Sequence, residues 1–383
     1  MTLGTSLVVD LSDLHHTEVR PLALSDEATP PEGTVLLAVE RFGLSANNIT
    51  YAGFGDAMGY WSFFPAPDGQ GHIPVWGHAR VLSSSHPDVA VGTEFYGFLP
   101  MATHLLVAPA AVDLRGFTDG STHRAARAAV YNRYLRRDVD PFAAASPSPE
   151  LEVVLRPLFT TSFLLEADLA EHGYHGADAV VMTSASSRTA LGTAHLISTR
   201  SRRPALVGLT RADHVADVQA VGCYDRVLPY EEAHSLPIGT TTLVDLSGDG
   251  QVVADLHHRL GDSLVHSAIV GATHWQAEPV DTVDLPGPPR TFFFAPEAAD
   301  RLRASAGPAA VESALAGGWR SFGELMAGWL RVRTGIGADE VAAAYLATLT
   351  GSASPRDALS CRCGADRAPD RSDASVGAGT IPP

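Results

Sequence analysis

The sequence contains no lysine, so all 27 of its Lys and Arg residues are arginines. This absence excludes mechanisms that need a lysine Schiff base or the lysine of a phosphate-binding P-loop. Three cysteines cannot build a disulfide framework and fit a reducing compartment. No run approaches the ~20 apolar residues of a membrane span, and the first residues lack a basic segment followed by an apolar core. We therefore expect a cytoplasmic protein with no membrane partner.

The balance of charge narrows the class of partner further. A net charge of −16 argues against a nucleic-acid backbone or an anionic membrane surface as the principal partner. At 383 residues and 45% hydrophobic content, the chain is long enough for two domains. Cys361 and Cys363 flank one arginine in a Pro-, Gly- and Asp-rich tail without two further ligands nearby, so we expect no bound metal.

Residues 179–197, AVVMTSASSRTALGTAHLI, predict a buried strand, a polar turn and a helix. The turn stands where dinucleotide-binding proteins carry G-x-G-x-x-G, and its glycines are missing. One interpretation is that the turn holds a diphosphate with hydroxyl donors and one cation at a helix N-terminus. The other is that the same short polar residues only cap the helix. The residues concerned are Ser184, Ser186, Ser187, Arg188 and Thr189.

From residue 178 onward, strand and helix patterns alternate about every twenty residues. This is the repeat of a doubly wound parallel sheet, in which ligands bind beyond the carboxyl ends of the strands. Residues placed there include Thr210, Arg211, Tyr230, Gly271 and His274. The predicted strands are 179–183, 205–209, 226–228, 242–246, 264–270 and 291–294, and the predicted helices 212–221 and 250–260.

The second of these strands ends in VGLTRAD. An acidic residue at this point usually holds the ribose hydroxyls of NAD, whereas an arginine accommodates the 2′-phosphate of NADP. Thr210 and Arg211 therefore favour NADPH. Two alternatives stay open: Arg211 starts a surface helix, or Asp213 faces the ribose instead.

Several other segments carry predictions about structure. Residues 1–115 are mainly β, and aromatic residues of the loop 41–67 either line a pocket or form a small core of their own. Residues 121–140 predict a basic helix, and residues 151–173 a helix interrupted near Pro157. Helices over 311–350 should pack back on the N-terminal domain, and residues 352–383 have too little apolar content to fold independently. The predicted divisions are 1–150, 151–300, 301–351 and a disordered tail, 352–383.

The segments RFGLSANNITYAGFGDAMGYWSFFP, PVWGHARVLSS, RPLFTTSFLL, TSASSRTALG, GCYDRVLPY and FFFAPE together resemble a family of unknown function of the DUF2855 type. The resemblance covers residues 1–355 and places the chain beside the zinc-free quinone and enoyl reductases of the medium-chain dehydrogenase/reductase superfamily. It implies a GroES-like β-rich N-terminal domain followed by a Rossmann-type domain. It also implies no catalytic zinc, because no cysteine precedes Cys223 and Gly77-His78-Ala79 replaces the GHE motif.

The resemblance transfers a few candidate catalytic positions. Asn48, with Asn47 as its rival, matches an asparagine near the nicotinamide ribose, and Tyr51 matches a proton donor, with Tyr60 and Thr161 as alternatives. It implies a zinc-independent, NADPH-dependent reductase of an enone, quinone or enoyl thioester in bacterial secondary metabolism. Loss of the donor should lower turnover roughly 10²-fold.

The glycine-free turn supports an alternative: a non-redox enzyme or an acyl-binding accessory protein on the same fold. The resemblance also implies a homodimer, because Thr291–Phe294 forms an apolar strand late in the sheet, where this superfamily often pairs two subunits.

Overall fold

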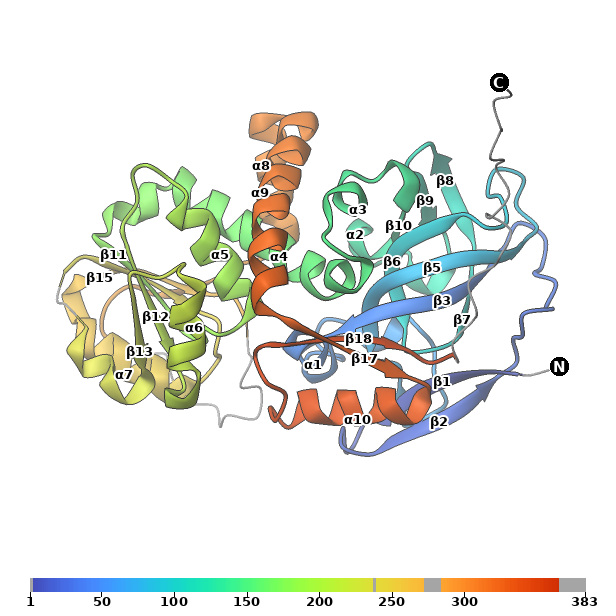
Figure 1. The fold of residues 1–383 in the computed structure, drawn as a ribbon, viewed down its shortest axis with the longest axis horizontal. Helices are drawn as coiled ribbons and strands as arrows, with labels where there is room; N and C mark the ends of the chain where they lie inside the picture. Colours follow the sequence, from blue (N-terminus) through green and yellow to red (C-terminus); the bar gives the residue numbers. More distant parts are fainter. Residues whose placement is uncertain (1–2, 237–238, 272–283, 365–383) are drawn as a thin grey trace, which may run out of the picture.

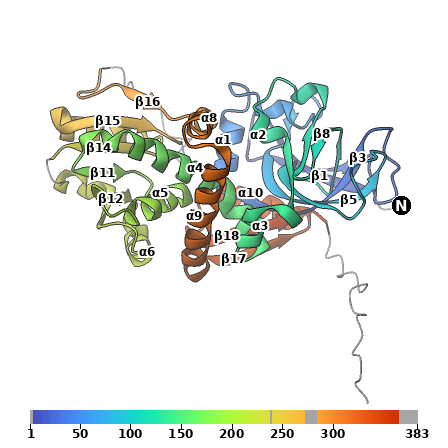
Figure 2. The same cartoon turned by 90° about the horizontal axis from the view of Figure 1, so that it is seen from above.

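The computed structural model describes residues 3–236, 239–271 and 284–364, which form a β-rich half and a half built on a parallel sheet. The predicted α/β class, with a β-rich part followed by a doubly wound sheet, is confirmed. Among these residues, no helix is both long and apolar enough to span a membrane. Figures 1 and 2 show three helices between the two halves: α4 (Pro149–Glu171), α8 (Ala295–Ala306) and α9 (Pro308–Trp329).

The β-rich half is organised around β3 (Val35–Leu44), which pairs with three other strands of a nine-stranded sheet. Val35, Leu37 and Val39 are buried in one core because side chains two residues apart point to the same face of a strand. Ten strands of this half precede α4: β1 (Gly4–Asp10), β2 (Thr17–Leu22), β3, β4 (Gln70–Gly71), β5 (Pro74–Ser84), β6 (Glu94–Pro100), β7 (His104–Val107), β8 (Pro109–Asp113), β9 (Gly116–Asp119) and β10 (Arg133–Arg136).

The second half has a six-stranded parallel sheet in the order β13-β12-β11-β14-β15-β16. All six predicted strands are present. The strands β11, β12 and β14 inside the sheet are short buried runs, whereas β16 at the edge is largely exposed. The order reverses between β11 and β14, the point at which such sheets bind ligands. The elements are β11 (Ala179–Met182), α5 (Arg188–Ser198), β12 (Ala205–Thr210), α6 (Val215–Val221), β13 (Arg226–Pro229), β14 (Thr241–Asp245), α7 (Gly250–Leu260), β15 (Leu264–Ile269) and β16 (Arg290–Phe292).

Helix α4 runs through Pro157 without a break, so the predicted interruption is wrong. The proline leaves the carbonyl of Val153 without its usual helical donor. Gly43 of β3 packs directly against that carbonyl, and a Cβ there would lie 2.4 Å from the oxygen. The close packing of sheet and helix outweighs the lost hydrogen bond, and α4 carries one face of the cleft described below.

The basic helix predicted over 121–140 is also wrong. The segment contains two short helical turns, Thr122–Arg124 and Arg137–Val139. Between these turns lie the four-residue helix α2 (Ala129–Asn132) and strand β10. Tyr134 points into the core, and four of the five arginines of this segment pair with carboxylates instead of forming a free basic face. These pairs are Arg124–Asp119, Arg133–Asp113, Arg136–Asp138, and Arg137 with Glu94 and Glu152.

The C-terminal part returns to the β-rich half, but through strands as well as helices. Between α9 and α10 (Ala338–Leu349), residues Arg331–Ile336 form β17, where a helix was expected. Gly337 has a φ of +86°, which ends the strand and starts α10. Residues Asp357–Arg362 form β18, between β17 and β3. The expected disorder of this segment is wrong, because its apolar side chains join an existing sheet and need no core of their own.

Candidate active site

The polar turn between β11 and α5 contains a serine in a strained backbone conformation. Ser184 has a φ of +50°, in the left-handed region that usually requires glycine. Its N–H donates to the hydroxyl of Tyr230 over 2.8 Å, which helps to hold this conformation. Ser187 caps α5, its hydroxyl accepting a hydrogen bond from the N–H of Ala190.

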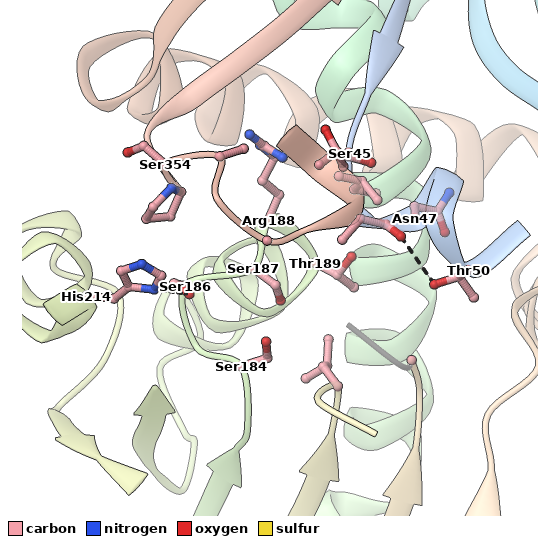
Figure 3. Close-up of a pocket in the computed structure, with 18 of the residues that line it drawn as sticks. Ser45, Asn47, Thr50, Ser184, Ser186, Ser187, Arg188, Thr189, His214 and Ser354 are labelled. Atoms are coloured by element: carbon pink, nitrogen blue, oxygen red, sulfur yellow. Dashed lines mark hydrogen bonds between the residues drawn. The ribbon is translucent and has the colours of Figure 1, made fainter. Parts of the chain in front are cut away.

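A cleft of about 460 Å³ separates this turn from the β-rich half. Figure 3 shows hydroxyl side chains from both halves around it, including Ser45, Thr50, Ser187 and Thr189. The structure thus brings together nearly all the residues predicted for cofactor binding. Those lining the cleft are Ser184, Ser186, Ser187, Arg188, Thr189, Thr210, Arg211, Tyr230 and Gly271; His274 lies outside the described residues.

Arg188 is a half-buried cation that lines the cleft. One guanidinium nitrogen donates to the backbone oxygen of Asp357 across the cleft, while Nε has no hydrogen-bond partner. No carboxylate of the described residues forms an ion pair with it. Burial lowers the pKa of Arg188 to about 10, and the charge of Asp357 only partly opposes this. A desolvated cation at the N-terminus of an eleven-residue helix is a site for an anion.

A second polar corner lies at the end of β12. The hydroxyl of Thr210 donates to the hydroxyl of Ser186 over 3.2 Å, and His214 lies beside Ser186. Arg211 makes two hydrogen bonds to Asp213, with both side chains more than half exposed. Of the two alternatives for ribose recognition, Arg211 lines the cleft and Asp213 does not, although the two side chains pair with each other.

Asp245, at the end of β14, is a fully buried carboxylate next to Leu246, which lines the cleft. One oxygen accepts hydrogen bonds from the hydroxyls of Thr183 and Ser247 and from the N–H groups of Ser247 and Gly248. The other accepts from Arg290 over 2.8 Å. Asp245 therefore connects the turns that follow β11 and β14.

Three of the four predicted catalytic residues lie outside the cleft lining. Both ends of the Asn48 amide bond backbone groups, at Ser45 and Pro74. Tyr51 and Tyr60 are buried in an aromatic cluster, so these aromatic residues of the loop 41–67 form a small core of their own and do not line the cleft. Burial raises the pKa of both phenols.

Asn47, the rival of Asn48, does line the cleft. Its amide nitrogen donates to the Tyr51 hydroxyl over 2.8 Å, and the indole of Trp76 donates to the same oxygen over 3.1 Å. Thr161 of α4 also lines the cleft, its hydroxyl bonded to the carbonyl of Pro157. This part of the cleft wall is therefore made by α1 (Ala46–Gly53) and α4.

The sequence did not point to several cleft residues. Ser45, Thr50 and His214 each lie within a few residues of a predicted site, which is the only signal they offered. Residues 348–357 also line the cleft, and no local pattern marked them, because they come from the far end of the chain. Among the residues that the structure describes, no three His, Cys, Asp or Glu side chains are placed to hold a metal ion.

Comparison with known proteins adds a family and a fold. The model of a family described as "Protein of unknown function (DUF2855)" matches residues 42–354. No curated protein matches the sequence.

Three solved structures match almost the whole chain. CurA of Vibrio vulnificus with NADPH has a TM-score of 0.59 at 12% identity, covering 95% of this chain and all of CurA. The YhdH oxidoreductase of Salmonella enterica with NADP has a TM-score of 0.53 at 16% identity, covering 94% of this chain and 99% of YhdH. The complex of Etr1p, a 2-enoyl thioester reductase of Candida tropicalis, with NADP and crotonyl-CoA has a TM-score of 0.57 at 11% identity. The match covers 94% of this chain and all of Etr1p. At these identities the comparisons show a shared fold.

Proposed function

The chain belongs to the DUF2855 family, and we propose that it is an NADPH-dependent reductase of activated alkenes that works without a catalytic zinc. The proposed substrate is an enone, a quinone or an enoyl thioester, and the proposed setting is bacterial secondary metabolism. The observation that carries the proposal is the guanidinium of Arg188 in a cleft between the two halves, where its Nε has no hydrogen-bond partner and no carboxylate of the described residues pairs with it. CurA and YhdH, whose fold the chain shares, were solved with NADPH and NADP.

The residues of the cleft fit a phosphorylated dinucleotide. The left-handed Ser184, the helix N-terminus of α5 and Arg188 together offer donors and positive charge to a diphosphate. Ser186, Thr210 and Arg211 offer hydroxyls and a cation to a 2′-phosphate at the end of β12. When bound, NADPH supplies the hydride.

At the other end of the cleft, the Asn47 amide is the group we assign to the substrate oxygen. Its nitrogen lies 2.8 Å from the Tyr51 hydroxyl, which also accepts from Trp76, so the orientation of the amide is fixed. A fixed amide donor stabilises negative charge that develops on a carbonyl oxygen during reduction. Tyr51 acts as a positioning residue in this proposal. Thr161 of α4 also lines the cleft, but its hydroxyl proton is donated to the Pro157 carbonyl, so it would reach the substrate only by giving up that hydrogen bond.

Nucleotide titration tests the proposal. We expect NADPH to bind in the micromolar range and NADH more weakly, as followed by nicotinamide fluorescence. Arg211→Ala should weaken NADPH binding about tenfold and leave NADH binding unchanged, because Arg211 is an exposed charge at the 2′-phosphate end. Arg202→Ala, an exposed arginine outside the cleft, is the matched control. If neither nucleotide binds to the wild-type protein, the reductase proposal fails.

Tyr51→Phe should lower kcat about tenfold while KM and the affinity for NADPH stay unchanged. The phenol oxygen that orients Asn47 is lost, whereas the cofactor end of the cleft is untouched. Tyr131→Phe removes a hydroxyl from the same aromatic cluster that contacts Tyr60 and not Asn47, so it should leave kcat unchanged. Equal losses in the two variants would mean that Tyr51 only supports packing.

One observation favours a second candidate function. The N–H of Ser184 donates to Tyr230, and serine and alanine replace the glycines of the turn, so this backbone is already engaged by the protein. The alternative is a non-redox enzyme or acyl-binding accessory protein on the same fold, which would bind an acyl thioester and neither nucleotide. Crotonyl-CoA, present in the Etr1p structure, is the probe for this case.

We also propose a homodimer formed through β16. This strand lies at the edge of the parallel sheet, and Phe292 is 60% exposed on it. Phe294, just beyond the strand, is 39% exposed. Pairing with a second copy would cover both rings and the open edge of the sheet.

A further inference from the structure

His214 stands in the corner of the cleft at the end of β12, and the sequence analysis gave it no role. Its Nδ1 lies 3.3 Å from the hydroxyl of Ser186, and it lines the cleft together with Thr210 and Arg211. Its side chain is 21% exposed, whereas Arg211 beside it is 55% exposed. Figure 3 shows His214 next to Ser186 at the rim of the turn. His214 is therefore the more enclosed of the two cationic side chains that reach this corner.

The hydrogen bonds around His214 leave its outer nitrogen as a donor. The Ser186 oxygen accepts a hydrogen bond from Thr210, so the Ser186 hydroxyl can donate its own proton to Nδ1 of His214. A neutral His214 that accepts at Nδ1 carries its proton on Nε2. When the ring is protonated, Nδ1–H donates to Ser186 and Nε2 still carries a proton. Nε2 lies 3.9 Å from the Asp213 carboxylate, which is too far for a hydrogen bond.

Charges of both signs face His214. Burial lowers the pKa of His214, and the nearby charge of Arg211 lowers it further. Asp213 and Asp217 raise it, although Asp217 also lies 3.6 Å from the guanidinium of Arg356. A dianion added to this corner would stabilise the protonated ring.

We propose, on the basis of the proposed function, that protonated His214 is a direct ligand of the 2′-phosphate of NADPH, so that the preference for NADPH over NADH falls as pH rises. The sign follows from linkage. A group whose pKa rises on binding contributes its full affinity below the pKa of the free protein, and this contribution is lost as pH rises through the pKa of the complex. NADH carries no 2′-phosphate and gains nothing from this charge.

Titration of the 2′-phosphate itself would change the affinity for NADPH in the opposite direction, so the test distinguishes a group of the protein from the phosphate. A phosphate monoester has a second pKa of about 6, so its dianion becomes more abundant as pH rises and binds a cation better. A ratio of affinities that falls between pH 6.5 and 8.5 therefore reports a group of the protein. One pKa unit of coupling corresponds to about a tenfold change in affinity.

The experiment measures dissociation constants for NADPH and NADH by calorimetry from pH 6.5 to 8.5. For the wild-type protein, we expect the affinity ratio to fall about threefold over this range, because burial lowers the pKa of free His214 and part of the fall therefore lies below pH 6.5. In His214→Gln, the ratio should be about threefold lower at pH 6.5 and should no longer fall. His258→Gln, an exposed histidine on α7 away from the cleft, should behave like the wild type.

Other outcomes overturn the inference. A wild-type ratio that stays flat or rises, or a fall that persists in His214→Gln, removes His214 from the site. A preference for NADH would assign the ribose to Asp213 and overturn the inference as well. A parallel titration with 2′,5′-ADP and 5′-ADP separates this inference from the reductase proposal. If NADPH fails to bind but 2′,5′-ADP is preferred with the same pH dependence, only the reductase proposal fails; if neither binds, both fail.

Discussion

Asp245→Ala should lower the free energy of unfolding by about 3–5 kcal/mol, the usual cost of breaking a buried ion pair from one side. The carboxylate is fully buried and accepts hydrogen bonds from Thr183, Ser247, Gly248 and Arg290. Alanine would leave the Arg290 guanidinium, which is 16% exposed, without its carboxylate partner. It would also separate the turns that follow β11 and β14.

Denaturant unfolding of the wild type and the variant measures this loss, and Asp255→Ala is the matched control. Asp255 lies on the exposed face of α7 and accepts one hydrogen bond from Gln251, so its removal should change stability by less than about 0.5 kcal/mol. A cost of less than 1 kcal/mol for Asp245→Ala would show that water replaces the carboxylate and that the two turns do not depend on it.

The parallel sheet was predictable because its strands carry a strong local signal. Ala179–Met182 and Thr241–Asp245 are short buried runs between helices, and burial on both faces needs no knowledge of distant partners. Strand β18 shows the opposite case. Its pairing with β3 joins residues more than three hundred positions apart, so composition alone indicated an unfolded tail.

The site was predictable where it follows strand ends and unpredictable where it depends on helix rotation. Asn47 and Asn48 are neighbours in α1, and consecutive residues of a helix point about 100° apart. One therefore faces the cleft while the other bonds the backbone at Ser45, and only the packing of α1 decides which. Tyr51 lies four residues after Asn47, on the same side of the helix, which is why the two side chains meet.

We expect the charge of Arg188 to lower the free energy of unfolding, although the same charge favours binding of an anionic ligand. Its pKa, lowered to about 10 by burial, means that the folded state holds this charge less favourably than the unfolded state does. Because the pKa is lowered, the penalty is present below about pH 10 and is relieved as pH rises above it. The hydrogen bond from Arg188 to the Asp357 carbonyl offsets only part of this loss of stability. An apolar side chain of similar length removes the charge without leaving a carboxylate unpaired.

Arg188→Met should therefore keep or raise the free energy of unfolding at pH 7, by up to about 1–3 kcal/mol after allowance for the part-exposed side chain. The same change should weaken NADPH and NADH binding alike, by about 10–100-fold, because both share the diphosphate that we propose the guanidinium binds. Arg200→Met gives the contrasting result: it strips the buried Glu166 of its partner, so stability falls while nucleotide affinity is retained. Unfolding curves and nucleotide titrations on the two variants measure both quantities. A loss of stability with unchanged affinity in Arg188→Met would make Arg188 a structural link from α5 to β18, whereas the opposite pattern marks it as an anion ligand whose burial is tolerated for binding.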